Sequence, residues 1–202
     1  VMTKLRTQHA RGEYQDAIDT GHAALSELGF PIIDAAPSGL SASAFASLPA
    51  MSDPMAMAAI EILEVLSTTA YMFDIERLFP PILHTALQVM LKFGITPAGS
   101  KILAWFAVET WREDIDEAYR LGLLSLELVE ESDGKRYRGG VKTLVTSFIL
   151  HWKQPYRSLE GKLLTALQDS LEVGDKSYAA GCYNVLTYLA CLSGRRLAPV
   201  HE

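Results

Sequence analysis

Apolar side chains recur every three or four residues along most of this chain, which is the spacing of helices with one buried face. The clearest case runs from Tyr14 to Leu28, after which Gly29 and Pro31 end the helical pattern. The pattern therefore predicts an all-α fold. The segments predicted to be helical are Met2 to Ala10, Tyr14 to Leu28, Pro54 to Tyr71, Pro81 to Phe93, Ala98 to Trp111, Asp114 to Glu131, Lys135 to Trp152, Pro155 to Val173 and Lys176 to Leu192.

Two stretches interrupt the helical pattern in the first half of the chain. Residues 31–49 are rich in Ala, Ser, Pro and Gly, so they are predicted to form a surface loop with one helical turn around Ala42 to Ala46. Ser52-Asp53-Pro54 then starts a nearly all-apolar helix that we expect to be deeply buried. Pro80-Pro81 removes two backbone donors, which predicts a short turn and a helix that begins at Pro81.

The predicted helices repeat at a fixed interval. Helix ends at Gly94, Gly134 and Gly174 lie 40 residues apart. The interval between the first two predicted helix starts is longer because it also contains the loop. We interpret it as one period plus an insertion over about residues 30–53. Such a period is typical of stacked repeats, and we interpret residues 1–202 as a single domain, an α-solenoid of antiparallel helix pairs. The helix starts are separated by 61, 40, 41 and 40 residues and are centred on Glu13, Asp74, Asp114, Pro155 and Arg195.

The overall charge limits the classes of partner that we expect, and the cysteines indicate the cellular compartment. The net charge of -6 gives no general affinity for nucleic acid or for an anionic membrane. Cys182 and Cys191 lie in one predicted helix, too far apart along its axis to form a disulfide, which favours a reducing cytoplasmic location. No signal peptide opens the chain, and its apolar runs are interrupted well short of about 18 residues. We therefore expect no membrane span.

Motifs that carry catalysis, cofactor binding or metal binding are missing from the sequence. It has no Gly-rich phosphate loop, no Gly-x-Ser-x-Gly elbow and no His-Glu-x-x-His. The acidic group from Glu109 to Glu117 is interpreted as a solvated helix start, and the basic cluster from Lys135 to Lys142 as paired with Glu130, Glu131 and Asp133. We predict no catalytic residue, no cofactor and no metal site, and a helical enzyme is the least favoured reading.

Several segments resemble the tetratricopeptide repeat. Gly12-Glu13-Tyr14-Gln15-Asp16-Ala17-Ile18, followed by Ala24-Leu25, is similar to the second helix of that repeat, and Glu113 to Leu126 is similar in outline. Pro155-Tyr156 with Ala166-Leu167 repeats the pattern, although Leu159 replaces the small residue of the family. The resemblance implies a right-handed superhelix, and the period of about 40 residues departs from the usual 34 or so.

Two longer segments resemble a narrower group. The stretches from Met51 to Tyr71 and from His151 to Ala179 are similar to the helical region that follows the AAA-type ATPase module in very large microbial signalling proteins. Those proteins join a Ser/Thr-kinase-like domain, the ATPase, this region, a GAF sensor and a histidine kinase. Both ends of the sequence also fall inside the repeating pattern. We therefore expect residues 1–202 to be a fragment of such a protein, whose nucleotide-binding and catalytic motifs lie elsewhere.

The tetratricopeptide alignment also suggests a binding surface. In that family the first helix of each unit lines a concave groove, and here this implies an aromatic-rich groove able to hold a peptide or helix. The alternative is that the same side chains only pack against neighbouring helices. The candidate residues for partner binding are Leu103, Trp111, Leu144, Phe148, His151, Trp152, Asn184 and Tyr188, with Ala107 beside them.

Two functions follow from these patterns. The first is a non-catalytic scaffold or regulatory segment that mediates protein interactions within a multi-domain signal-transduction kinase, with flanking domains of the same polypeptide as its partners. The second is a sensor module that binds a ligand or peptide in the groove. Both are compatible with a homo-oligomer.

Overall fold

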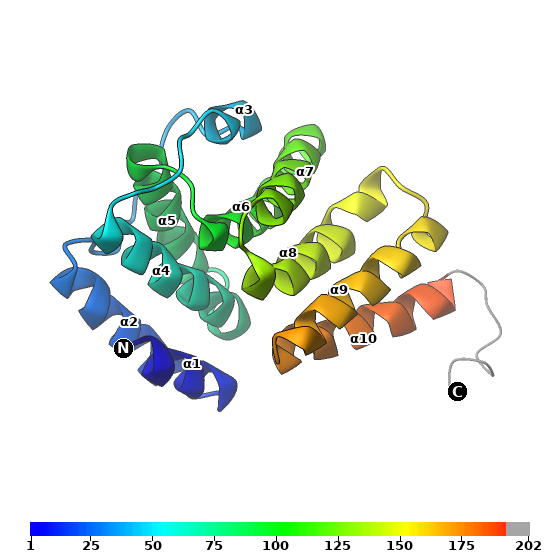
Figure 1. Cartoon of the computed structure of the whole chain (residues 1–202), viewed down its shortest axis with the longest axis horizontal. Coiled ribbons are helices and arrows are strands. Elements are labelled where there is room, and N and C mark those ends of the chain that lie inside the picture. The colour runs from blue at the N-terminus through cyan, green and yellow to red at the C-terminus, as the bar shows by residue number, and fades with distance from the viewer. Residues whose placement is uncertain (193–202) are drawn as a thin grey trace. The chain divides into compact units, whose positions relative to one another are not determined.

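The computed structural model describes residues 1–192, and these residues are helical almost throughout (Figure 1). They form ten α-helices and two 3₁₀-helices. They contain no β-strand, only one isolated bridge between Ala50 and Ile95. The all-α prediction is thus confirmed.

The chain divides into two compact units. The first is Val1–Trp105 and the second begins at Phe106. Helix α6 (Pro97–Thr110) contains the division between them. The interpretation of residues 1–202 as a single repeat domain stays a prediction, and the helix start expected around Arg195 lies outside the described residues.

The first unit is built from pairs of neighbouring helices. Helices α1 (Met2–Ala10) and α2 (Tyr14–Glu27) pack against each other and against α4 (Pro54–Phe73), which also packs against α5 (Phe79–Phe93). Because a Cβ on Gly21 would come within 2.6 Å of the Leu66 side chain, the absence of a side chain there lets α2 approach α4 closely.

Helix α4 is the buried helix that its composition predicts. Its start is capped by Asp53, whose side chain accepts hydrogen bonds from the Met55 and Ala56 amides at 2.9 Å. By length and composition α4 is also long and apolar enough to cross a membrane. However, 61% of its apolar window is buried inside the protein, and a core helix passes the same test.

The short turn predicted before the double proline is present at residues 75–78, and only the first residue of the helix that follows differs from the prediction. The helix begins at Phe79 rather than at Pro81, so both prolines lie in its first turn. Amides in the first turn have no partner within the helix, so replacing them with proline costs no hydrogen bond.

The loop between α2 and α4 is fastened to α5. It contains the predicted helical turn, α3 (Ala42–Ala46), whose Phe45 is fully buried. The Ile33 amide donates to Thr85 Oγ1, and Gln88 Nε2 donates to the Ala35 carbonyl, both at 2.9 Å. The insertion therefore forms part of the core of the first unit.

Gly94, one of the regularly spaced helix ends, has a specific role beside this loop. Its φ of +105° favours glycine, and a Cβ would overlap the carbonyl oxygen of Pro49. The Ile95 amide donates to that same carbonyl at 2.8 Å. The glycine thus lets the end of the loop lie directly against the end of α5.

The second unit contains α7 (Ile115–Glu131), α8 (Lys135–Phe148), α9 (Glu160–Glu172) and α10 (Lys176–Leu192). Helix α8 packs against the other three, and α9 also packs against α10 (Figure 1).

Two helix boundaries in this unit differ from the prediction. Helix α8 ends at Phe148 rather than at Trp152, and a 3₁₀-helix, η1 (Leu150–Trp152), follows it. Helix α9 begins at Glu160 rather than at Pro155, after a second 3₁₀-helix, η2 (Tyr156–Ser158). Pro155 is extended, with ψ of 138°, and a proline also keeps the residue before it out of the helical region. The interruption places several aromatic side chains on a turn instead of on a helix.

Candidate binding surface

The structure brings together some of the residues predicted to line the groove. Trp111, His151 and Trp152 lie side by side in the second unit, and Phe148 is half-buried at the end of α8. Leu103 and Leu144 are buried core residues, and Leu103 belongs to the first unit. Asn184 and Tyr188 are exposed on α10.

The aromatic cluster is a row of neighbouring rings, stacked at Trp111–Trp152 and His151–Tyr156 and tilted by 38° at His151–Trp152. We use this name for Trp111, His151, Trp152 and Tyr156. The Trp111 and Trp152 ring centroids are 5.3 Å apart with planes at 23°. The His151 ring lies 4.8 Å from Trp152 and 6.0 Å from Tyr156, almost parallel to the latter at 10°. At the other end of the row, the Arg112 guanidinium lies 5.7 Å from the Trp111 ring, within range of a cation–π interaction.

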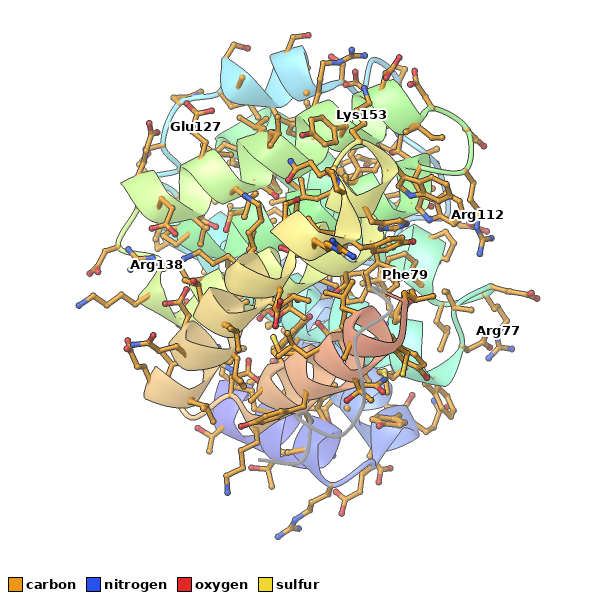
Figure 2. The ribbon with its side chains drawn as sticks, turned by 90° about the vertical axis from the view of Figure 1, so that its right-hand side faces the viewer. Arg77, Phe79, Arg112, Glu127, Arg138 and Lys153 are labelled. Carbon is orange, nitrogen blue, oxygen red and sulfur yellow. The ribbon has the colours of Figure 1, made fainter. Side chains whose placement is uncertain are left out.

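Hydrogen bonds hold the row in place. The Trp152 indole Nε1 donates to the Phe148 carbonyl at 3.1 Å, which ties the ring to the last turn of α8. Lys153 forms an ion pair with Asp116 near the start of α7, the helix toward which its side chain points in Figure 2. Gln154 Nε2 donates to the Tyr119 hydroxyl at 2.8 Å. The turn that carries the cluster is thus fastened to α7.

The cluster faces solvent and is largely uncharged. Trp152 is 45% exposed and Tyr156 is 43% exposed. Burial lowers the pKa of His151, and the Ser147 backbone only partly offsets this, so its imidazole is neutral at pH 7. Exposed aromatic rings that are already held in place lose little conformational entropy on binding. Such rings are typical of surfaces that bind other proteins.

The charged groups of Asp114, Glu117 and Arg120, near the cluster, form a helix cap and an ion pair. Asp114 caps α7 by accepting a hydrogen bond from the Glu117 amide at 2.9 Å, and Glu117 pairs with Arg120 at 2.6 Å. This agrees with the interpretation of the acidic group as a helix start. Within residues 1–192, no three His, Cys, Asp or Glu side chains are grouped so as to hold a metal ion.

The basic cluster joins three helices. Arg138 on α8 pairs with Glu130 on α7 at 3.2 Å, as expected from their proximity in the sequence. Lys142 lies 2.7 Å both from Glu130 and from Asp169 on α9. Asp169 was not predicted, because nothing in a local pattern relates residues that are 27 positions apart.

Replacing Lys142 with methionine is expected to lower the free energy of unfolding by about 1–2 kcal/mol, because two partly buried carboxylates lose their partner. Burial opposes the charged amine, but the hydrogen bonds to Asp169 and Glu130 outweigh it and raise the pKa of Lys142. A raised pKa gives stability that is fully present at neutral pH and is lost only as pH rises through the folded-state value. Urea unfolding at pH 7 measures the loss, and an unchanged midpoint would contradict the bridging role.

A buried ion pair in the first unit was missed by sequence reasoning. Lys101 on α6 pairs with Glu64 on α4, and their side chains are only 8% and 6% exposed. Glu64 is one of two acids in this apolar helix, the other being Glu61, but nothing in the sequence indicates its partner.

No protein family, curated protein or solved structure matches this chain significantly. The fold and the site together define an all-α protein with an exposed aromatic cluster in its second unit.

Proposed function

We propose that this chain is a non-catalytic helical-repeat segment, a tetratricopeptide-like α-solenoid, that scaffolds or regulates a multi-domain signal-transduction kinase. Its partners are then protein segments, foremost the flanking domains of the same polypeptide. The observation that carries the proposal is a set of side-chain contacts that recur at nearly constant sequence separation.

In two places, these contacts join a helix to the helix after next. On α4 and α6, Glu64 pairs with Lys101 and Trp105 Nε1 donates to Thr68 Oγ1 at 3.4 Å, each over 37 residues. On α8 and α10, Thr143 Oγ1 lies 3.0 Å from Cys182 Sγ, over 39 residues. The similar separations in the two units support the period of about 40 residues that the glycine spacing predicts. Such nearest-neighbour packing supports stacked helix pairs.

The aromatic cluster supports a role in binding. Its Trp152 ring is hydrogen-bonded to the end of α8, and Gln154 in the same turn is hydrogen-bonded to α7. The same surface also supports the second candidate function, a sensor module that binds a peptide.

Removing the aromatic cluster should uncouple the segment from its partner. In the full-length polypeptide, Trp152→Ala is expected to change histidine autophosphorylation at least fivefold without changing the melting temperature by more than a few degrees, because Trp152 is half exposed. Leu123→Ala is the matched control, since Leu123 on α7 is similarly exposed, at 44%, and is not among the aromatic rings.

Three results would count against the proposal. Turnover of ATP by residues 1–202 alone would make the segment an enzyme. Equal effects of Trp152→Ala and Leu123→Ala would remove the aromatic cluster from the coupling. Flanking DNA that encodes neither an upstream phosphate loop nor a downstream histidine-kinase core would remove the signalling context.

A further inference from the structure

A groove opens in the first unit where the beginnings of α1 and α4 meet the end of α2. It has a volume of about 810 Å³, within the range of surface clefts that hold ligands. We call it the three-helix groove, and it is separate from the aromatic cluster, which belongs to the other unit. Its apolar lining comes from all three helices and includes Met2, Ala24, Leu28, Met57, Ala58 and Ile62.

The three-helix groove combines buried apolar residues with flexible side chains. Ala24 and Ile62 are its most buried residues, with exposed fractions of only 7% and 3%. Met2 is half-buried and Met57 is 41% exposed, so both thioether side chains are open to a partner. An unbranched methionine adopts several rotamers, which lets such a surface pack around apolar side chains of different shapes. The groove therefore provides a site for large apolar side chains.

The length of the groove matches about two turns of a helix. Along α4 its lining runs from Pro54 to Ile62, which corresponds to about 12 Å at about 1.5 Å per residue. Side chains at positions i and i+4 of a partner helix lie about 5–6 Å apart, so two of them enter the groove together. A helical segment therefore fits the groove with two anchoring side chains.

The side chains of Glu27 and Glu61 add negative charge to the groove. They line it from α2 and α4, and both residues are exposed. Glu61 lies 3.8 Å from Arg6, a long distance for an ion pair, and Glu27 has no cationic partner within residues 1–192. The end of α2, which carries partial negative charge, lies at the same place. The groove therefore complements a segment that carries lysine or arginine.

We propose that the three-helix groove binds a basic amphipathic helix of a partner protein. Leucine or methionine side chains of that helix enter the groove, and its lysine or arginine side chains lie against Glu27 and Glu61. An acidic helix would be repelled by the two glutamates, and a neutral one would leave Glu27 without a counter-charge beside an apolar contact. The proposal depends neither on the aromatic cluster nor on the proposed signalling function.

Fluorescence anisotropy with a synthetic peptide tests the groove. The peptide contains only leucine and lysine, in the i, i+3, i+4, i+7 spacing of an amphipathic helix, and carries a fluorescein label. The protein is titrated to about 200 μM against a trace amount of this lysine peptide. Saturable binding is expected, about tenfold or more tighter than binding of a glutamate peptide, in which glutamate replaces every lysine.

Variants of the groove show where the peptide binds. Glu27→Lys combined with Glu61→Lys should weaken binding of the lysine peptide about tenfold or more and reverse the preference, so that the glutamate peptide binds more tightly. Ala58→Trp should weaken binding of the lysine peptide without any change of charge, because the indole fills the groove. Glu131→Lys combined with Glu172→Lys is the matched control, since it changes the net charge equally but lies on α7 and α9.

Circular dichroism melting of each variant shows whether it is folded, which is expected because all the substituted residues are exposed. Absence of saturable binding, equal binding of the two peptides, or equal weakening by the control variant would overturn the proposal. So would a sedimenting mass that rises with concentration in the original chain but not in Ala58→Trp, which would assign the groove to a second copy of the chain. Any of these failures leaves the proposed signalling function intact, because that function is tested through Trp152 in the other unit.

Discussion

Replacing Lys101 with methionine is expected to lower the free energy of unfolding by about 3–5 kcal/mol. The substitution keeps the length of the side chain but leaves the carboxylate of Glu64 buried without its cation. Both side chains are less than a tenth exposed, so water cannot replace the lost partner. Urea unfolding followed by circular dichroism measures the loss.

The double variant Glu64→Met with Lys101→Met separates two explanations of that result. If the cost comes from an unpaired buried charge, removing both charges should recover most of the stability, because an apolar pair of similar volume avoids desolvation altogether. If the double variant is as unstable as the single one, the loss of stability comes from disturbed packing around α4 and α6 and not from the unpaired charge.

Gly139→Ala is expected to cost about 2–3 kcal/mol, although alanine is the better helix former. Gly139 lies on α8 against α9, and a Cβ there would overlap the Ser170 side chain and come within 2.7 Å of the Ser170 backbone nitrogen. Backbone cannot rotate away as a side chain does, so the two helices must move apart. Thermal or urea unfolding of the purified chain gives the size of the effect.

Gly161→Ala is the matched control for this substitution. Gly161 is also helical, in α9, but a Cβ at that position meets nothing within 4 Å. The substitution should therefore be neutral or stabilise the protein by about 0.5 kcal/mol, through lower entropy of the unfolded chain. A similar loss of stability at both positions would show that close packing against α9 is not the reason for the effect of Gly139→Ala.

Most of the helices could be predicted from the sequence because their signals are local. Tyr14 to Leu28 and Lys176 to Leu192 were predicted within one residue of α2 and α10, and the short turn at Ala42 to Ala46 coincides with α3. Where the prediction failed, at Pro81 and Pro155, the sequence did indicate an irregularity. It did not determine whether the proline would begin a helix or precede a separate turn.

The candidate surface was only partly predictable. The alignment with the tetratricopeptide repeat selected Trp111 and Trp152, and the rings of these two residues are stacked in the structure. The same alignment also selected Leu103 and Leu144, which are buried. It missed Tyr156, which enters the row only because the chain leaves α8 and turns through two 3₁₀-helices.

The sequence by itself determined the helical class and most helix boundaries, because apolar spacing, caps and prolines act over a few residues. Tertiary structure alone decided which distant side chains meet, as with Glu64 and Lys101 or Lys142 and Asp169. It also decided which surfaces remain open, including the three-helix groove of the first unit. The physical reason is that a single helix pattern shows which side is apolar but not which neighbour covers it.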